Sequence, residues 1–508
     1  MLAQVDVFVG PEVQWFALSP LLTLLGGALG LLLVGALTPA WPRRLYAVVS
    51  ATTAGAAGVL AVVLWDDISD EGTKTLVGGA MALDKLAMFL TITICIGVVL
   101  VSMLTDEYLE DTPNAGPEIY ALYLVAAIGG IVMASANDLI VLFLGLETLS
   151  LAMYVLAASN RRSSQSAEAG IKYFVLGGFA SAFFLYGIAL VYGGTGTTNI
   201  SDMVTALQTT IDPFGDDTLV LAGLAMLIVG LAFKVAAAPF HVWVPDVYQG
   251  APTPVTALMA SVGKAAAFAA MIRVLVVALP FYRDDWRPVI WVLALVTLLA
   301  GSILAVVQRN VKRMLAYSSI SHAGFILVGV EAAGHLAGEA DPGPGVPSVV
   351  LYLMLYSVLV IGSFAVVTIV SRSSDGDTTL GSFAGLATRR PLLALGFTVL
   401  LLAQAGVPLT SGFIAKFGVI QAAVEVESYA IAVIAMVSAV IAAFLYLRIM
   451  VSMWVEAPAT ENVATDTEVR VPFSMGATVA ATVAFTIVLG IVPGWLIDAA
   501  DQVTQYAR

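Results

Sequence analysis

Long apolar runs constrain this chain more than any other feature of its sequence. Residues 21–37, 119–136 and 289–307 contain no ionised side chain. About twenty helical residues, each rising about 1.5 Å, cross the ~30 Å hydrocarbon core of a bilayer. Only 11% of the 508 residues are charged, whereas a soluble protein has about a quarter. The sequence therefore predicts an all-α, polytopic membrane protein that forms one membrane domain (1–508).

Apolar runs of this length recur along the chain and predict about fourteen transmembrane helices. Two of them, 218–245 and 391–425, are too long for one straight crossing and contain Pro239 and Pro408. Because proline removes a backbone hydrogen bond and clashes with the preceding turn, both helices should be broken. The predicted spans are 17–37, 45–65, 84–104, 118–136, 138–157, 170–192, 218–245, 253–279, 288–307, 311–330, 346–370, 391–425, 428–453 and 472–497.

The two proline-containing spans indicate a weak internal repeat. Aligning Pro239 with Pro408 also places Ser150 on Ser319. The alignment gives two successive five-helix units, and because five is odd, the second unit must be inverted relative to the first. Inverted repeats with broken helices are typical of transporters, whose ion sites lie near the middle of the membrane. The predicted parts are helices 1–3 (1–110), the first repeat (118–279), the second repeat (288–453) and helix 14 (472–497).

Lysine and arginine residues predict the orientation in the membrane. Basic residues concentrate in loops after odd-numbered spans, and cytoplasmic loops carry the excess of such residues. The odd-numbered loops should therefore be cytoplasmic, and both termini should lie outside. The odd-side residues are Arg43, Arg44, Arg161, Arg162, Arg309, Lys312, Arg313, Arg372, Arg389, Arg390 and Arg470, against Lys74, Arg283, Arg287 and Arg508 on the other side.

Four ionisable residues lie deep inside predicted spans, namely Glu147, Lys234, Lys264 and Lys416. A charge at the centre of a membrane helix costs roughly 2.5–3.5 kcal/mol on insertion scales, so it usually marks a function. Glu147 and Lys234 could form a static ion pair that only fixes packing, but this leaves the other two lysines without an acidic partner. Since an apolar surrounding disfavours the charged amine, a buried lysine can exchange a proton near neutral pH. The four residues are therefore predicted to carry protons.

Three further residues are weaker candidates for the same path. His241 lies just beyond Pro239, where a broken helix admits water, so a relay role is favoured for it. His322 lies within an apolar helix, where a histidine is more often a hydrogen-bonded packing residue. Lys172 lies near the start of a span and could either join the relay or extend its amine to the membrane surface.

Other chemistries have little support in the sequence. Cys95 is the only cysteine, which excludes intrachain disulfides, cysteine-ligated zinc and cysteine-held iron–sulfur clusters. The net charge of −13 includes no basic patch, so nucleic-acid binding is not expected. Gly263-Lys264 is followed by Ala265 and is not a phosphate-binding loop. We expect no flavin, nicotinamide or metal cofactor on this chain.

The same residues give the chain a family resemblance. It resembles the antiporter-like subunits of proton-pumping NADH–quinone oxidoreductase, respiratory complex I. The characteristic stretches are FKVAAAPFHVWVPDVYQGAPTPVTALMASVGKAAAF and RNVKRMLAYSSISHAGFILVG. The chain is most similar to the subunit N type. We expect no room after the last span for the lateral helix of subunit L, and subunit M usually has Glu where this chain has Lys416.

The resemblance implies roles for the buried charges. Glu147 and Lys234 would form a pair that modulates a proton site, Lys264 would be the central carrier, and Lys416 would face the exit. It also implies coupling to NADH oxidation and quinone reduction elsewhere in a complex of membrane subunits in the bacterial plasma membrane. A subunit of the related multisubunit sodium/proton antiporters is the alternative, because these also use buried Glu and Lys. A structural membrane scaffold is a third possibility.

Overall fold

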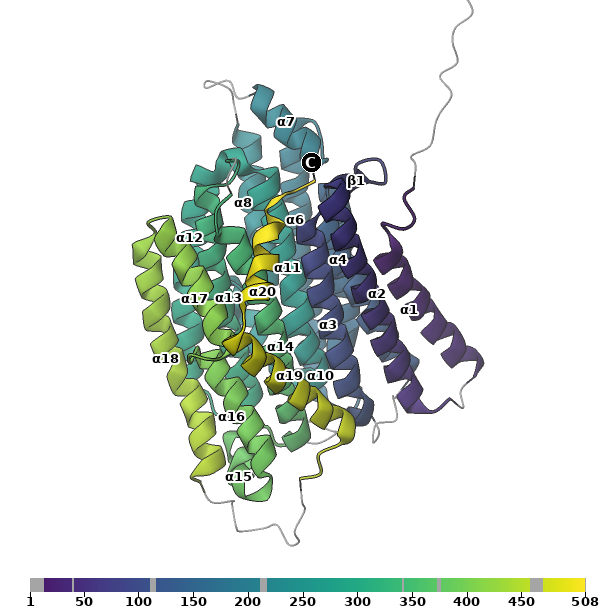
Figure 1. Cartoon of the computed structure of the whole chain (residues 1–508), viewed down its shortest axis with the longest axis vertical. Coiled ribbons are helices and arrows are strands. Elements are labelled where there is room, and N and C mark those ends of the chain that lie inside the picture. The colour runs from purple at the N-terminus through teal and green to yellow at the C-terminus, as the bar shows by residue number, and fades with distance from the viewer. Residues whose placement is uncertain are drawn as a thin grey trace, which may run out of the picture.

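The computed structural model describes residues 13–38, 41–109, 116–210, 217–339, 342–371, 376–456 and 469–507. Within these residues the chain is a bundle of long helices that run approximately along one axis (Figure 1). Thirteen described helical stretches are long and apolar enough to cross a membrane. A fourteenth crossing consists of α16 (Pro391–Ala405) and α17 (Ser411–Glu425), each too short to cross alone. The prediction of an all-α membrane protein with about fourteen crossings is confirmed.

The observed helices follow the predicted spans closely. The N-terminal helices are α1 (Ser19–Leu37), α2 (Arg43–Glu71) and α3 (Lys85–Tyr108). The first repeat holds α4 (Pro117–Ser135), α5 (Leu139–Ala157), α6 (Ser164–Thr195), α8 (Thr218–Val235), α9 (Trp243–Gly250), α10 (Thr253–Leu258) and α11 (Lys264–Met271). The second repeat holds α12 (Arg283–Val306), α13 (Val311–His335), α14 (Gly345–Ser371), α16, α17 and α18 (Tyr429–Trp454), and α19 (Phe473–Ile491) follows it.

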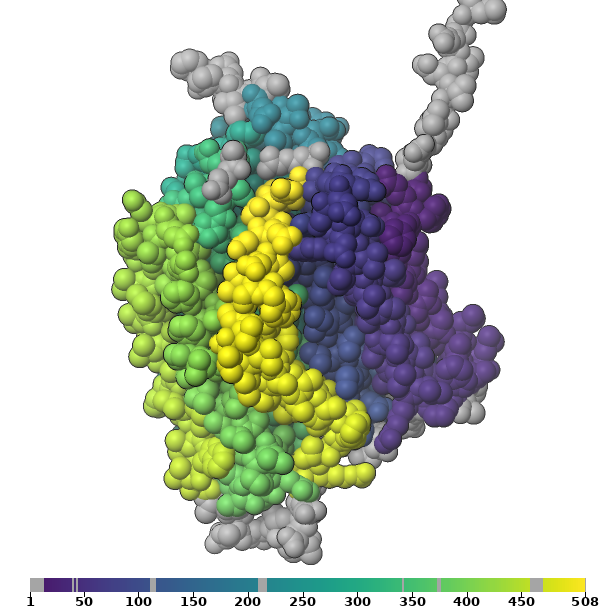
Figure 2. Space-filling view, in the orientation of Figure 1, coloured from purple at the N-terminus to yellow at the C-terminus, as the bar shows by residue number. Residues whose placement is uncertain are grey.

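Several elements were not predicted. A hairpin of β1 (Lys74–Leu76) and β2 (Met81–Leu83) precedes α3, and the short helices are α7 (Ile200–Thr210), α15 (Leu386–Arg389) and α20 (Gly494–Asp501). The last predicted span, 472–497, is corrected to two helices, because α19 ends at Ile491 and Pro493 precedes α20. Figure 2 shows this C-terminal segment lying across the bundle, where α19 contacts α3 and α14.

Both predicted helix breaks are confirmed. The chain leaves α8 through Ala236, which has a left-handed φ of 67°, and a short 3-10 turn (Phe240–Val242) leads into α9. The second break follows α16 at Gly406, where φ is 91°. Glycine adopts this conformation at little steric cost and commonly ends helices. Each break leaves main-chain groups unpaired within its own helix.

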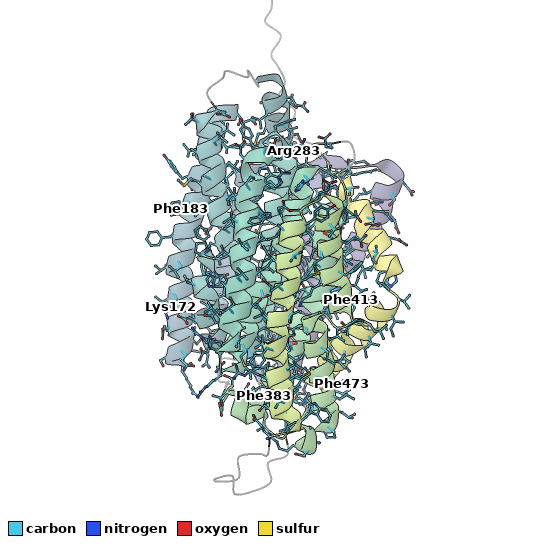
Figure 3. All side chains as sticks on the ribbon, turned by 90° about the vertical axis from the view of Figure 1, so that its left-hand side faces the viewer. Lys172, Phe183, Arg283, Phe383, Phe413 and Phe473 are labelled. Atoms are coloured by element: carbon cyan, nitrogen blue, oxygen red, sulfur yellow. The ribbon has the colours of Figure 1, made fainter. Side chains whose placement is uncertain are left out.

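The two five-helix units are inverted, as predicted. The residues between α4 and α5 lie on the β1–β2 hairpin, since Asn137 N donates to Ala80 O at 3.0 Å. α4 therefore runs toward the end of the bundle that carries the hairpin, here named the hairpin end. α12 begins at that same end, near Arg283 in Figure 3, and runs away from it. The other end carries α15 and is named the arginine end.

Burial is greatest in the middle of the bundle. The span Val311–His335 is buried except near its two ends, and the spans Thr253–Ala278 and Gly345–Ser371 are almost entirely buried. The outer helices α1, α2 and α6 instead expose large apolar side chains. Exposed side chains such as Phe183 (Figure 3) present a surface suited to lipid. The polar groups of the interior must therefore find their hydrogen-bond partners within the protein itself.

One buried ion pair joins the first repeat to the N-terminal helices near the hairpin end. Arg273 donates to both carboxylate oxygens of Asp84 at 2.7 Å, and its Nε donates to Ala134 O at 2.8 Å. Asp84 in turn accepts from Ala87 N at 2.9 Å and so caps α3. Both side chains are at most 1% exposed. These contacts give Arg273 a structural role.

We predict that Arg273→Met destabilises the protein by about 3–5 kcal/mol, because it leaves the Asp84 carboxylate buried and unpaired. Thermal unfolding of the detergent-solubilised protein measures this loss. Arg448→Met is the matched control, since Arg448 donates to Val306 O and Gln308 O at the end of α12 and is only partly buried. An equal loss of stability in the two variants would contradict the assignment.

Candidate functional site

The four deep ionisable residues predicted from sequence all lie inside the bundle. Glu147 lies in α5, Lys234 in the last turn of α8, Lys264 at the start of α11, and Lys416 in α17. Lys264 and Lys416 are only 3% and 5% exposed. Two of these helices flank a break, so the interrupted segments help to position the amines.

Lys234 is held by hydroxyl groups of α5. Its Nζ donates to Ser150 Oγ at 2.7 Å and to Tyr154 OH at 3.4 Å. Glu147 precedes these residues by one and two turns on a similar face of the helix. The charges of Glu147 and Lys234 interact, but within the described chain they form no ion pair, and Glu147 Oε1 is buried without a hydrogen-bond partner. Glu147 and Lys234 are therefore neighbouring charges that make no direct contact, and Ser150 accepts the hydrogen bond of the lysine.

Lys264 is held by α13. Its Nζ donates to the main-chain oxygen of Ser319 and, at 2.7 Å, to Ser319 Oγ. It also lies 5.3 Å from the centre of the Tyr356 ring, a distance at which a cation gains energy from the aromatic face. The helix around Lys264 contains π-helical segments at Met259–Gly263 and Ile272–Ala278. Such wide turns are frequent at functional sites, and they were not predicted.

Ser150 and Ser319 are equivalent in the predicted repeat alignment. The structure gives them the same task, because each accepts a hydrogen bond of 2.7 Å from a buried lysine. The two lysines come from different positions, Lys234 from the broken helix and Lys264 from the next span. This correspondence supports the repeat on chemical grounds.

His322 stands at the centre of a polar cluster beyond Lys264. Its Nδ1 is 2.7 Å from Tyr352 OH, and its Nε2 is 3.3 Å from Tyr446 OH. Tyr446 OH is also 2.6 Å from Ser318 Oγ, and Ser318 donates to Gln404 Oε1 at 3.2 Å. The cluster thus extends from α13 to the last turn of α16, next to the second break.

His322 is the one member of this cluster that was predicted from the sequence. The run of Ser318, Ser319, Ser321 and His322 in a buried helix was the available signal. Tyrosine and glutamine are unremarkable in apolar spans, so Tyr352, Tyr446 and Gln404 gave none.

Lys416 lies against the end of a half-helix. Its Nζ donates to Ala405 O, the last residue of α16, at 3.1 Å, and lies 4.8 Å from the centre of the Phe325 ring. The C-terminal end of a helix carries partial negative charge and free carbonyl groups, which favour a cation. The second break therefore supplies a place for an ammonium group inside the membrane.

Of the three weaker candidates, His322 belongs to the polar cluster, whereas Lys172 and His241 lie apart from it. Lys172 is 39% exposed and makes ion pairs with Glu168 at 2.6 Å and Asp246 at 2.7 Å, and Asp246 also pairs with Arg313 at 2.7 Å. These groups border a cavity of about 170 Å³. His241 is partly exposed in the first break, and its Nδ1 has no hydrogen-bond partner among the described residues.

Inverted five-helix units with broken helices and buried lysines define an antiporter-like membrane subunit. The family model described as "NADH:quinone oxidoreductase/Mrp antiporter, TM" matches residues 136–442. The chain belongs to this family, within the subunit N group of NADH-quinone oxidoreductase.

Individual comparisons agree with this placement. NADH-quinone oxidoreductase subunit N of Rhodococcus opacus (strain B4) is 39% identical and covers 100% of this chain and 99% of its own. A chain of respiratory complex I from Thermus thermophilus with bound aureothin is 30% identical, with a TM-score of 0.76 and coverage of 95% and 100%. A chain of the Mrp complex from Dietzia sp. DQ12-45-1b is 22% identical, with a TM-score of 0.80 and coverage of 97% of both chains, and shares the fold.

We predict unequal effects for the equivalent serines. Ser150→Ala removes the closest acceptor of Lys234 and should cost about 1–3 kcal/mol, whereas Ser319→Ala leaves Lys264 its main-chain acceptor and should cost about 0.5–1.5 kcal/mol. Thermal unfolding compares the two variants. Ser438→Ala is the control, because Ser438 is buried and its Oγ has no described partner. A larger loss for Ser319→Ala than for Ser150→Ala would contradict this account.

Proposed function

We propose that this chain translocates protons along Glu147, Lys234, Lys264, the His322 cluster and Lys416. NADH oxidation and quinone reduction elsewhere in the complex would drive the transfer. One observation carries the proposal. In the described structure the hydrogen bonds of Lys234, Lys264 and Lys416 go to neutral oxygens and none to a carboxylate. Each amine can therefore lose its proton without leaving a hydrogen-bonded carboxylate unpaired.

The lysine partners suit a group that changes its charge. A hydroxyl can donate or accept, so Ser150 and Ser319 can remain hydrogen-bonded to a charged or to a neutral amine. Lysine also has a compact ammonium group that burial can make neutral, whereas arginine stays protonated. Glu147, whose Oε1 is buried without a described partner, is placed to sense the charge of Lys234. The charges of Lys264 and Lys416 would both act on His322.

The direction of transfer follows from the proposed orientation. The arginine end would be cytoplasmic, because loops rich in Arg and Lys face that side. Arg372 and Arg508, which entered the topology argument, lie outside the described residues. The Lys172–Asp246 cavity lies on the arginine-end side of the first break and would admit protons toward Lys234. His241, in the break itself, would receive water there.

The partners would be the other membrane subunits of an NADH-quinone oxidoreductase in a bacterial plasma membrane, together with lipid and protons. The relatives are named as subunits of that enzyme. The redox groups would belong to other subunits, since the chain has one cysteine, too few to hold an iron–sulfur cluster. The same fold occurs in an Mrp complex, so a sodium/proton antiporter is the second candidate. Co-purification with NADH-oxidising subunits distinguishes the two.

We predict that Lys264→Met and Lys264→Arg both abolish most proton transfer through this subunit. Methionine has a similar length but no titratable amine, and arginine does not release its proton at physiological pH. Proton translocation per NADH, measured with the complex in vesicles and with assembly checked on native gels, tests both variants. Wild-type translocation by Lys264→Arg would show that this position needs only a positive charge, as a scaffold would.

We also predict that a cysteine at Ser164 is reached by impermeant thiol reagents only from the cytoplasm. Ser164 is exposed at the start of α6, at the arginine end, and the native Cys95 is buried. Asp70→Cys, which lies at the hairpin end and is also exposed, should be labelled from outside in intact cells. The reverse pattern would overturn the proposed orientation.

A further inference from the structure

A second group of titratable side chains lies at the hairpin end of α13, apart from the four residues of the proposed path. Glu331 is 3% exposed. Its Oε1 accepts from His335 Nε2 at 3.0 Å and from Ser428 Oγ at 3.2 Å. Its Oε2 is buried and has no hydrogen-bond partner among the described residues. A carboxylate oxygen in this state is costly, and it is also free to receive a proton.

The group connects this buried carboxylate to the surface. His335 Nδ1 lies 2.9 Å from Arg287 NH1, and the side chains of His335 and Arg287 are 24% and 29% exposed. An arginine can only donate, so Nδ1 must accept and Nε2 must carry the hydrogen. His335 therefore donates to Glu331 and supports its ionised form. Arg287 fixes the tautomer from the solvent side.

Glu331 also lies beyond Lys416 in the direction of the hairpin end. Lys416 Nζ lies over the ring of Phe325 in α13, and Glu331 is six residues further along that helix, about 9 Å at the usual rise. Gly329 lies between them, and Ser348 Oγ is 3.1 Å from the point where its Cβ would be. A hydroxyl group is therefore present at the intermediate height.

Glu331 differs in burial from the carboxylates around it, and Asp84, the other buried carboxylate named at this end, is paired with Arg273. Asp284, Glu339, Glu425 and Glu427 are exposed. Among the described residues Glu331 is thus the buried carboxylate between Lys416 and the water at the hairpin end. α17 carries Lys416 and packs on α13, and the turn after it brings Ser428 to the same carboxylate.

We propose that Glu331 is the proton-release site of this subunit and that His335 and Arg287 gate it. The proposal rests on the proton path proposed above. A proton that leaves the Lys416 ammonium through water forms an O–H bond at Glu331 Oε2 and neutralises the carboxylate. The neutral acid attracts the His335–Arg287 pair less strongly. When His335 turns toward solvent, the O–H bond breaks and the proton passes to water at the hairpin end.

A purely structural role is the competing explanation, because the cluster also ties α12, α13 and the α17–α18 turn together. A structural link between helices requires only hydrogen bonds, whereas a proton-release site requires a group that gains and loses a proton. Glu331→Gln separates the two roles, since its amide oxygen can still accept from His335 and Ser428 but cannot carry a proton. Glu331→Asp keeps the titratable group.

The experiment uses the assembled complex in vesicles and measures proton translocation per NADH, with assembly checked on native gels. We expect Glu331→Gln to lose most of the translocation assigned to this subunit, and Glu331→Asp to retain much of it. Glu425→Gln, the same change at an exposed carboxylate of this end, should translocate normally. Translocation by Glu331→Gln at the wild-type ratio would overturn the release site, and so would an equal fall in Glu425→Gln.

Two further variants keep the test decisive. If Glu331→Gln does not assemble, His335→Leu replaces it, because His335 is partly exposed and leucine can neither donate to Glu331 nor accept from Arg287. Normal translocation in His335→Leu would then exclude this outlet. Lys264→Met is measured in parallel. If Lys264→Met blocks proton translocation and Glu331→Gln does not, only the proposed release site is wrong. If Lys264→Met translocates protons normally, the proposed proton path itself is wrong.

Discussion

The rest of this structure depends on the fact that hydrocarbon offers no hydrogen bonds to the backbone. A chain in lipid must be helical, and it can be interrupted only where the protein interior satisfies the freed groups. Both interruptions meet this condition with side chains, either from a neighbouring helix or from the half-helix beyond the break. At the first break Ala238 N donates to Thr297 Oγ at 2.8 Å, and Trp243 Nε1 donates to Phe233 O at 3.2 Å. At the second, Lys416 donates to Ala405 O. The need to satisfy a broken helix and the need to hold a cation are met by the same contact.

The interior contains two kinds of buried cation, and their partners separate them. Arg273 is locked by both oxygens of Asp84, and neither group can change its charge without leaving the other unpaired. Lys264 and Lys416 instead donate to serine or main-chain oxygens, which tolerate a neutral amine. The first arrangement fixes helices, and the second permits titration. Burial alone does not distinguish the arginine from the lysines.

The sequence predicted the crossings, the two breaks and the depth of the four charges, because apolar length, proline and isolated ionisable residues are local signals. It could not predict which side chains meet. α13 and α14 are apolar or buried on all sides, and a helix without a polar face gives no information on its rotation. The contact of Lys264 with Ser319 in α13 and that of His322 with Tyr352 in α14 were therefore missed. Glu331 was missed because the predicted span ended at residue 330, whereas α13 continues to His335.

Ser150 and Ser319 occupy equivalent positions in the two repeats, but the lysines that they contact do not. This difference bears on how the two repeats are coupled. Ser150 meets Lys234 of its own unit, but Ser319 of the second unit meets Lys264 of the first. Lys264 therefore belongs to both units, and His322 beside it interacts with the charge of Lys416 as well. A strictly symmetric pair of units would hold two separate proton sites. Under the proposed proton path one lysine crosses the boundary, so a change of charge in the first unit would alter the electrostatic environment of the second, and the two half-paths would act as one.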